Sequence, residues 1–248
     1  MGIAVTVLGS AAMYATLERC CSGYLVEYGG RKLWVDAGGG TWRQLLQFTD
    51  HRAIDGVVLT HRHPDHTIDV FQALHARLFG EEEPLSSIPL WAPGETIERL
   101  LAFSPELEGA FDLRAVAEGE SVDADGAKLS FVRMAHPPET LGVRIEHAGA
   151  VVAYSADTGP TADFRALAGD ADLFLCEATF QDSDEEWEGH MRASQAGVAA
   201  ADAGAKKLVL THLPAARDLG LSLAEAQKSS GDAEVQLAAD GLRLEVQA

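Results

Sequence analysis

His61-Arg62-His63-Pro64-Asp65-His66 is the stretch of sequence that decides how this chain is interpreted. It places three imidazoles and a carboxylate within six residues, a pattern that this composition would produce by chance about once in a thousand chains. Imidazole binds zinc and other first-row ions, and a carboxylate adds charge compensation. In a loop after a strand, alternate residues can face one metal while the adjacent Asp-His pair faces a second. The stretch therefore predicts a metal centre.

Three further candidate ligands each follow an apolar run that predicts a β-strand. His136 follows LSFVRMA, Asp157 follows VVAYSA, and His212 follows KLVLT. Open α/β folds present their reactive groups at strand ends, so residues distant in sequence can converge there. A single His or Asp is more often structural. The shared position after strands favours metal ligation for all three.

The composition predicts one domain and a small substrate. With 248 residues, 47% of them hydrophobic, the chain can bury one large core, and we expect a single α/β domain over residues 1–248. Lys and Arg total 19 against 38 Asp and Glu, giving a net charge of −19 that repels long polyanions such as tRNA or DNA. A small anionic substrate remains compatible, because bound metal ions reverse the local field.

The sequence also predicts a cytoplasmic protein without a membrane partner. The three cysteines, Cys20, Cys21 and Cys176, form no disulfide framework, which suits a reducing compartment. No Lys or Arg precedes Arg19, so the charged region of a secretory signal is missing. No apolar stretch is long enough to span a bilayer. The oligomeric state stays open, with a homodimer as one candidate.

Short β-rich runs alternate with amphipathic helical runs along the chain. The predicted strands cover residues 3–8, 24–28, 32–36, 56–60, 129–134, 141–146, 151–155, 173–177 and 208–211. The predicted helices cover residues 42–48, 67–79, 96–103, 162–168, 194–203 and 223–229. Residues 80–93, with three consecutive glutamates and three prolines, predict a mobile surface loop. No linker interrupts this order, which supports the single domain.

Six motifs together resemble the metallo-β-lactamase superfamily, in the branch of ribonuclease Z and bacterial cyclic-nucleotide phosphodiesterases. They are THRHPDH, AHPPETLGVRI, SADTG, LFLCEATF, GHMRASQAG and LVLTHLP, and the resemblance spans nearly the whole chain. It implies a four-layer αβ/βα sandwich with two divalent metal ions between the edges of two sheets. Zinc is the first expectation, and manganese or iron would also suit these ligands.

The resemblance also implies a role for each site residue. One metal would be held by His61, His63 and His136, the other by Asp65, His66 and His212, with Asp157 bridging both. Glu177 would orient and charge His190, which would protonate the departing alkoxide. Asp65 would add charge compensation and is a candidate for orienting the nucleophile. Ribonuclease Z usually has a His before that Glu, whereas this chain has Cys176, which we expect to be buried and inert.

The short segment between two ligands favours a small substrate. Ribonuclease Z carries a long tRNA-gripping arm between the positions of His136 and Asp157, which here are only 21 positions apart. Together with the negative charge, this favours hydrolysis of 3′,5′-cyclic nucleotides to 5′-nucleotides. Phe180 or Trp187 is a candidate to stack on the base, and packing of the loop explains both aromatics equally well.

Three alternative functions remain open at this stage. The same metals and acid would serve a ribonuclease Z-like RNA endonuclease. The metal centre alone would also serve a lactone, thioester or β-lactam hydrolase, which has less need of an acid at Glu177 and His190. A non-enzymatic metal-binding protein is disfavoured, because no expected ligand is missing.

Overall fold

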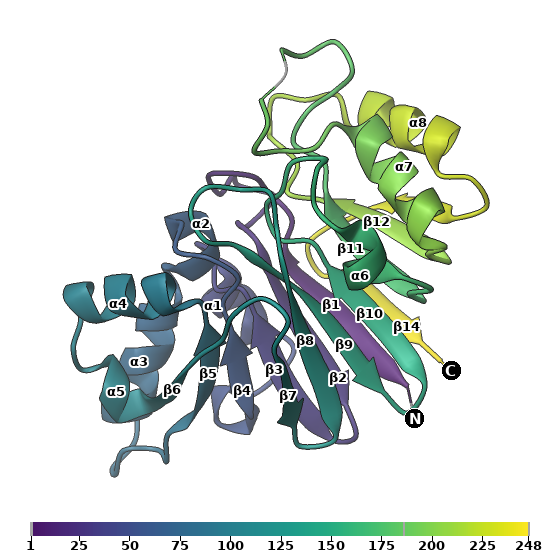
Figure 1. The fold of residues 1–248 in the computed structure, drawn as a ribbon. Helices are drawn as coiled ribbons and strands as arrows, with labels where there is room; N and C mark the ends of the chain where they lie inside the picture. Colours follow the sequence, from purple (N-terminus) through teal and green to yellow (C-terminus); the bar gives the residue numbers. More distant parts are fainter. Residues whose placement is uncertain (1, 186, 248) are drawn as a thin grey trace.

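Two seven-stranded β-sheets face each other in the computed structural model, which describes residues 2–185 and 187–247 (Figure 1). The first sheet has the order β14-β1-β2-β3-β4-β5-β6, and the second has the order β13-β12-β11-β10-β9-β8-β7. The strands of the first sheet are β1 (Ile3–Gly9), β2 (Gly23–Tyr28), β3 (Arg31–Val35), β4 (Gly56–Val58), β5 (Ile88–Ala92), β6 (Phe111–Ala115) and β14 (Arg243–Val246). Those of the second are β7 (Ser121–Ala124), β8 (Ala127–Arg133), β9 (Leu141–His147), β10 (Ala150–Tyr154), β11 (Leu173–Glu177), β12 (Lys207–Thr211) and β13 (Glu234–Leu237).

Alternating side chains along each strand build separate cores on the two faces of each sheet. In β3, Leu33 and Val35 enter the core between the sheets, whereas Trp34 points to the outer face. In β11, Leu175 enters the same central core and Phe174 faces outward. Both faces of these strands are therefore buried, and their sequences are apolar almost throughout.

Helices cover the outer face of each sheet and complete four layers (Figure 1). Those on the first sheet are α1 (Thr41–Leu45), α3 (Val70–Phe79), α4 (Gly94–Phe103) and α5 (Leu107–Ala110), and those on the second are α6 (Phe164–Ala168), α7 (Ala193–Ala203) and α8 (Leu219–Ser229). A 3₁₀ turn, His51–Ala53, and a short helix, α2 (Pro64–Thr67), complete the elements. The expected αβ/βα sandwich is confirmed.

Parallel pairing brings the carboxyl ends of several strands to one edge of each sheet. In the first sheet β3, β4, β5 and β6 pair in parallel, and in the second sheet β10, β11, β12 and β13 do so. The loops that leave these strands meet at the same end of the sandwich, above α2 in Figure 1. The motif 61–66 leaves β4 at this end.

Some predicted boundaries were wrong. Residues 80–93 were predicted as one surface loop, but Ile88–Ala92 forms β5, whose last three residues are buried between β4 and β6. Proline is unfavourable inside a strand, yet Pro89 is the second residue of β5, near the strand start, where a missing donor is tolerated. Residues 42–48 and 67–79 form shorter helices than predicted, α1 and α3. Strands β6, β7, β13 and β14 and helix α5 were not assigned beforehand.

None of the helices within the two described ranges is long and apolar enough to cross a membrane.

Candidate metal centre

The predicted ligands lie in the loops and the short helix that follow strand ends. His61 and His136 each come three positions after a strand, β4 and β8, and Asp157 comes three after β10. His212 directly follows β12, in a left-handed backbone conformation with φ 51°. His63 precedes α2, and Asp65 and His66 lie within it. The first sheet thus supplies the 61–66 motif, and the second sheet supplies the remaining three ligands.

The first cluster consists of His61, His63, His136 and Asp157. His63 Nδ1 lies 3.1 Å from His61 Nε2 and 3.4 Å from His136 Nε2. Asp157 Oδ2 lies 3.7 Å from His61 Nε2 and 3.9 Å from His136 Nε2. Ligand atoms around a tetrahedral zinc ion are separated by about 3.2–3.6 Å, since each bond is about 2.0–2.2 Å long. The four side chains are therefore close to a coordination shell.

The second cluster consists of Asp65, His66 and His212, with Asp157 beside it. Asp65 Oδ2 lies 3.4 Å from His212 Nε2 and 3.8 Å from His66 Nε2. Asp157 Oδ1 lies 3.1 Å from His66 Nε2 and 3.4 Å from His212 Nε2. One oxygen of Asp157 faces each cluster, which is the arrangement that a bridging carboxylate needs.

Two orphaned atoms show that these side chains fit a metal ion. His66 Nε2 and Asp157 Oδ1 are buried and have no hydrogen-bond partner among the residues described, although they lie only 3.1 Å apart. Buried polar atoms without a partner are costly and call for an explanation. A cation that displaces the proton of His66 would satisfy both atoms, because deprotonated Nε2 and the Asp157 carboxylate then each offer a lone pair to the same space.

In four of these histidines, Nε2 faces a cluster and Nδ1 forms a hydrogen bond on the opposite side of the ring. The pairs are His61 Nδ1 with Thr60 Oγ1 at 3.1 Å, His66 Nδ1 with Asp36 Oδ2 at 2.7 Å, His136 Nδ1 with the Gly189 carbonyl at 2.7 Å, and His212 Nδ1 with Thr179 Oγ1 at 3.0 Å. An acceptor at Nδ1 keeps the proton there and leaves Nε2 free for a metal. The protein thus orients each imidazole toward the clusters.

Asp36 is a functional residue that sequence reasoning missed. Its buried carboxylate accepts the Thr60 amide and hydroxyl, both at 2.9 Å, and the Tyr154 hydroxyl at 3.0 Å, besides His66. It therefore fixes His66 directly and His61 through Thr60. Its place at the end of a predicted strand was the available signal, shared with Asp157, but nothing in the sequence paired it with a histidine.

Burial and mutual charge set the protonation of the histidines. Burial lowers the pKa of His61, His63 and His136, which keeps their imidazoles neutral and able to coordinate. Burial also acts on His66, but the carboxylates of Asp157, Asp36 and Asp65 outweigh it and raise its pKa well above the usual range. An ion entering the second cluster would displace that proton.

Glu177 and His190 form a charged dyad beside the clusters. Glu177 ends β11 and is fully buried, and its Oε1 lies 2.6 Å from His190 Nδ1. Glu177 also accepts the backbone amides of Thr158 and Met191, which fixes the carboxylate. The His190 ring stacks on that of His212, with centroids 5.4 Å apart. Burial lowers the pKa of His190, but Glu177 outweighs it and raises the pKa to about 9.

The comparisons with known proteins agree with this architecture. The family model of the Beta-lactamase superfamily domain matches residues 31–213, which is most of the chain. The chain belongs to the metallo-β-lactamase superfamily. An uncharacterized protein of Mycobacterium leprae is 32% identical to this superfamily member, with 99% of this chain and 89% of the relative covered.

Two further relatives show that this superfamily member is a metallo-hydrolase related to ribonuclease Z. YhfI of Bacillus subtilis, named a probable metallo-hydrolase, is 30% identical over 85% of this chain and 86% of its own. The crystal structure of that metallo-β-lactamase fold protein superposes with a TM-score of 0.89, covering 98% of each chain at 28% identity. A ribonuclease Z of Archaeoglobus fulgidus is 25% identical over 90% of this chain and 92% of its own.

Burial keeps the three cysteine thiols of this metallo-β-lactamase fold protein protonated. Cys176 is fully buried, and burial raises the pKa of its thiol beyond the range of an active nucleophile. Cys21 lies near Asp65, and burial raises its pKa to about 11. Burial and Asp240 raise the pKa of Cys20 to about 12.

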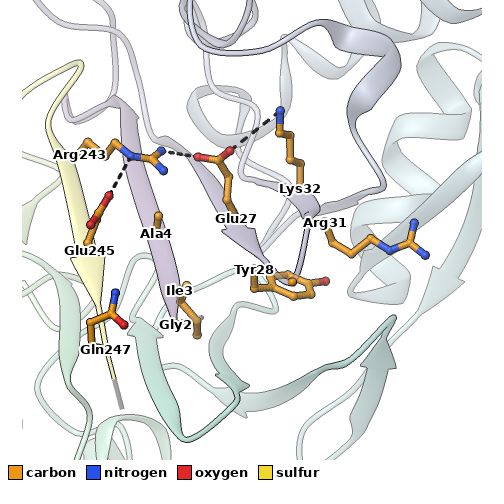
Figure 2. A pocket seen from close by; sticks show the side chains of 12 residues that line it. Gly2, Ile3, Ala4, Glu27, Tyr28, Arg31, Lys32, Arg243, Glu245 and Gln247 are labelled. Atoms are coloured by element: carbon orange, nitrogen blue, oxygen red, sulfur yellow. Dashed lines mark hydrogen bonds and ion pairs between the residues drawn. The ribbon is translucent and has the colours of Figure 1, made fainter.

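A groove of about 290 Å³ lies at the other end of the first sheet (Figure 2). Its charges are paired, since Arg243 bonds Glu27 and lies 3.8 Å from Glu245, and Lys32 lies 4.0 Å from Glu27. Arg31 pairs with Asp55 and Asp125 outside the groove. Its lining contains no His, Cys or Asp. This superfamily member therefore concentrates its ligand chemistry at the opposite end, around the two clusters.

Proposed function

We propose that this metallo-hydrolase cleaves small phosphodiesters, with 3′,5′-cyclic nucleotides as the preferred class and 5′-nucleotides as products. The Glu177–His190 dyad carries this proposal. It lies against the clusters, and His190 Nδ1 is held at 2.6 Å while the structure gives Nε2 no partner among the described residues. A phosphodiester with an alkoxide leaving group needs a proton at that point, whereas acyl hydrolysis needs a dedicated acid less.

We further propose that the clusters hold two divalent ions, with zinc as the first candidate. His61, His63 and His136 would hold one ion, Asp65, His66 and His212 the other, and Asp157 both. Such ions supply hydroxide near neutral pH and neutralise charge on phosphoryl oxygens. Asp65 and Asp157 would balance the charge of the ions, and Asp65 would also orient the attacking water.

His190 would act on the leaving group. Glu177 favours its protonated form at neutral pH, and with Nδ1 bonded to Glu177 the proton on Nε2 is the one available for transfer. In 3′,5′-cyclic nucleotide hydrolysis that proton would go to the 3′ oxygen as its bond to phosphorus breaks. The 5′-nucleotide leaves, and solvent reprotonates His190.

The strands between His136 and Asp157 support a small substrate. Only β9 and β10, joined by the tight turn at Ala148 and Gly149, occupy this segment. Nothing protrudes from it that could grip a tRNA. The net charge of −19 also disfavours tRNA as a substrate, because phosphate contacts need Lys and Arg partners.

An RNA endonuclease activity is the second candidate, since ribonuclease Z is among the relatives of this chain. It would use the same ligands and the same acid. A turnover panel of cyclic nucleotides, bis(4-nitrophenyl) phosphate, pre-tRNA and a lactone separates these classes. We expect cyclic nucleotides to be turned over and pre-tRNA to be left intact; the reverse result would replace the proposal with the second candidate.

Replacing His190 by Ala tests the role of the dyad. We expect kcat for cyclic AMP to fall by about 10²–10⁴-fold, because the 3′ alkoxide then leaves without a proton. Bis(4-nitrophenyl) phosphate, whose leaving group needs no proton, should lose far less. The measurement is kcat for both substrates, with metal content determined on the same samples.

The matched control is His75→Ala, which removes an exposed histidine on α3. It should leave both rates unchanged. Equal losses for the two substrates in His190→Ala, at full metal content, would show that His190 does not serve as the acid.

A further inference from the structure

The loop of residues 11–19 is fixed against the second metal cluster. Ala11 forms a bridge with Leu213, the residue after His212, and the Ala12 amide donates to the Leu213 carbonyl at 3.3 Å. At the other end of the loop, Arg19 Nη1 donates to the same carbonyl at 3.0 Å. Both ends of the loop are therefore tied to the residue that follows a candidate ligand.

The tip of this loop touches the cluster itself. The Met13 amide donates to Asp65 Oδ2 at 2.9 Å, and Met13 has φ 62°, in the left-handed region that side-chain-bearing residues rarely adopt. Such backbone strain persists only where the surrounding structure enforces it, and it concentrates at functional sites. Here the strain turns the amide toward Asp65.

The same turn leaves large apolar side chains in solvent beside the site. Met13 is 58% exposed and Tyr14 is 56% exposed, whereas most large apolar residues of this chain are buried. On the dyad side, Trp187 is 47% exposed, and its ring centroid lies 4.9 Å from that of His190 and 5.8 Å from that of His136. Exposed apolar surface thus adjoins the metal centre next to both clusters.

We propose that Met13 and Tyr14 form a wall that contacts the nucleobase of the substrate and determines its specificity. This inference rests on the proposed cyclic-nucleotide activity. The Met13 amide bonds Asp65, so Met13 and the adjacent Tyr14 start next to the second cluster, where the phosphoryl group would bind, and both side chains are exposed. The base is the apolar, flat part of such a substrate, and aromatic and thioether groups contact every base through its face.

Tyr14→Ala and Met13→Gly test the wall. Glycine keeps the amide that bonds Asp65 and accepts φ 62° without strain, so Met13→Gly removes the side chain alone. We expect each variant to raise KM for cyclic AMP about five- to tenfold, with kcat nearly constant. Relative to methyl 4-nitrophenyl phosphate, which has no base, kcat/KM for cyclic AMP should fall by the same factor. Calorimetric binding of 5′-AMP should weaken in parallel.

Phe79→Ala is the control, because it removes an exposed aromatic ring at the end of α3 without touching the loop. It should change none of these values. Equal loss for cyclic AMP and the base-free diester would show that the loop acts on Asp65 alone. Unchanged KM, or a change confined to the oligomeric state, would make the wall a structural or subunit contact. A wild-type protein inactive on cyclic AMP would instead refute the proposed function.

Discussion

Glu177 governs the protonation of His190, and the pH profile should reveal it. The carboxylate raises the pKa of His190 to about 9 against the opposing effect of burial. The acid is then protonated at neutral pH, and activity on cyclic AMP should fall as pH rises through the His190 pKa. In Glu177→Gln the charge is lost and burial lowers the pKa, so we expect the basic limb of kcat to move to lower pH.

Bound cations would lower the pKa of His190 in the wild type and in Glu177→Gln alike. The test is therefore the direction in which the basic limb moves between the two proteins. Bis(4-nitrophenyl) phosphate serves as the internal control, because its leaving group needs no proton. If the basic limb of the kcat profile does not move in Glu177→Gln, Glu177 positions the loop that carries His190 but does not set the pKa of His190.

Asp36 should control metal affinity although it touches no ion. Asp36 accepts the Thr60 amide at Oδ1, and the Thr60 hydroxyl, His66 and Tyr154 at Oδ2. In Asp36→Asn, an NH₂ replaces one of these oxygens, so the donors that face it lose their acceptor. We expect metal affinity to fall about 10–100-fold, as for other residues that orient metal-bound histidines. Competition with a chromophoric chelator measures this affinity.

Asp112→Asn, on the exposed face of β6, is the matched control and should bind metal normally. A lower melting temperature of Asp36→Asn with unchanged affinity would restrict Asp36 to a structural role.

The candidate ligands could be predicted from the sequence because each follows an apolar run, and strand ends converge. The residues that hydrogen-bond to these ligands could not be predicted. Thr60 and Thr179 lie just after strands and close to candidate site residues, but nothing in the sequence separates such a threonine from any other loop residue. The Met13 contact with Asp65 depends on loop conformation, which hydrophobic periodicity does not encode.

At the scale of elements, the loop after β3 positions α2 and with it two candidate ligands. The Ala37 amide donates to the His66 carbonyl at 2.7 Å, and Gly38 packs against α2 so closely that an added Cβ would lie 2.1 Å from the Asp65 carbonyl oxygen. Gly38→Ala should therefore displace α2. We expect reduced metal content, measured by elemental analysis, and a loss of stability of about 1–3 kcal/mol.

Gly94→Ala at the start of α4 is the control, since no atom lies within 4 Å of its added Cβ. Normal metal content in Gly38→Ala would mean that α2 adjusts without moving its ligands.

Elements with strong periodicity were predicted well, and those fixed by tertiary pairing were not. Strand β11 has the predicted boundaries because its five residues are apolar or site-bearing and buried on both faces. Strand β6 reads Phe-Asp-Leu-Arg-Ala, partly exposed at the sheet edge, where pairing with β5 decides the conformation. Its local sequence fits a loop equally well.

At the scale of the whole molecule, the negative charge should exclude long nucleic acids. With 38 acidic and 19 basic residues, we expect the Kd for labelled pre-tRNA to be weaker than about 10⁻⁴ M at physiological salt. Fluorescence anisotropy measures it, with 5′-AMP binding in the same buffer as the positive control. Micromolar binding that weakens steeply with salt would show a local basic surface that outweighs the net charge.

The division of the ligands between the two sheets has a consequence for the lifetime of the protein. Neither sheet alone holds a complete cluster, so ions bound at the two clusters would bind the native chain more tightly than the unfolded one. Ions that bind only the native state stabilise it, by about 2.7 kcal/mol at a hundredfold excess over Kd. Metal supply then sets the fraction of molecules open to proteases. A cell short of metal would lose this hydrolase by turnover as well as by inactivity.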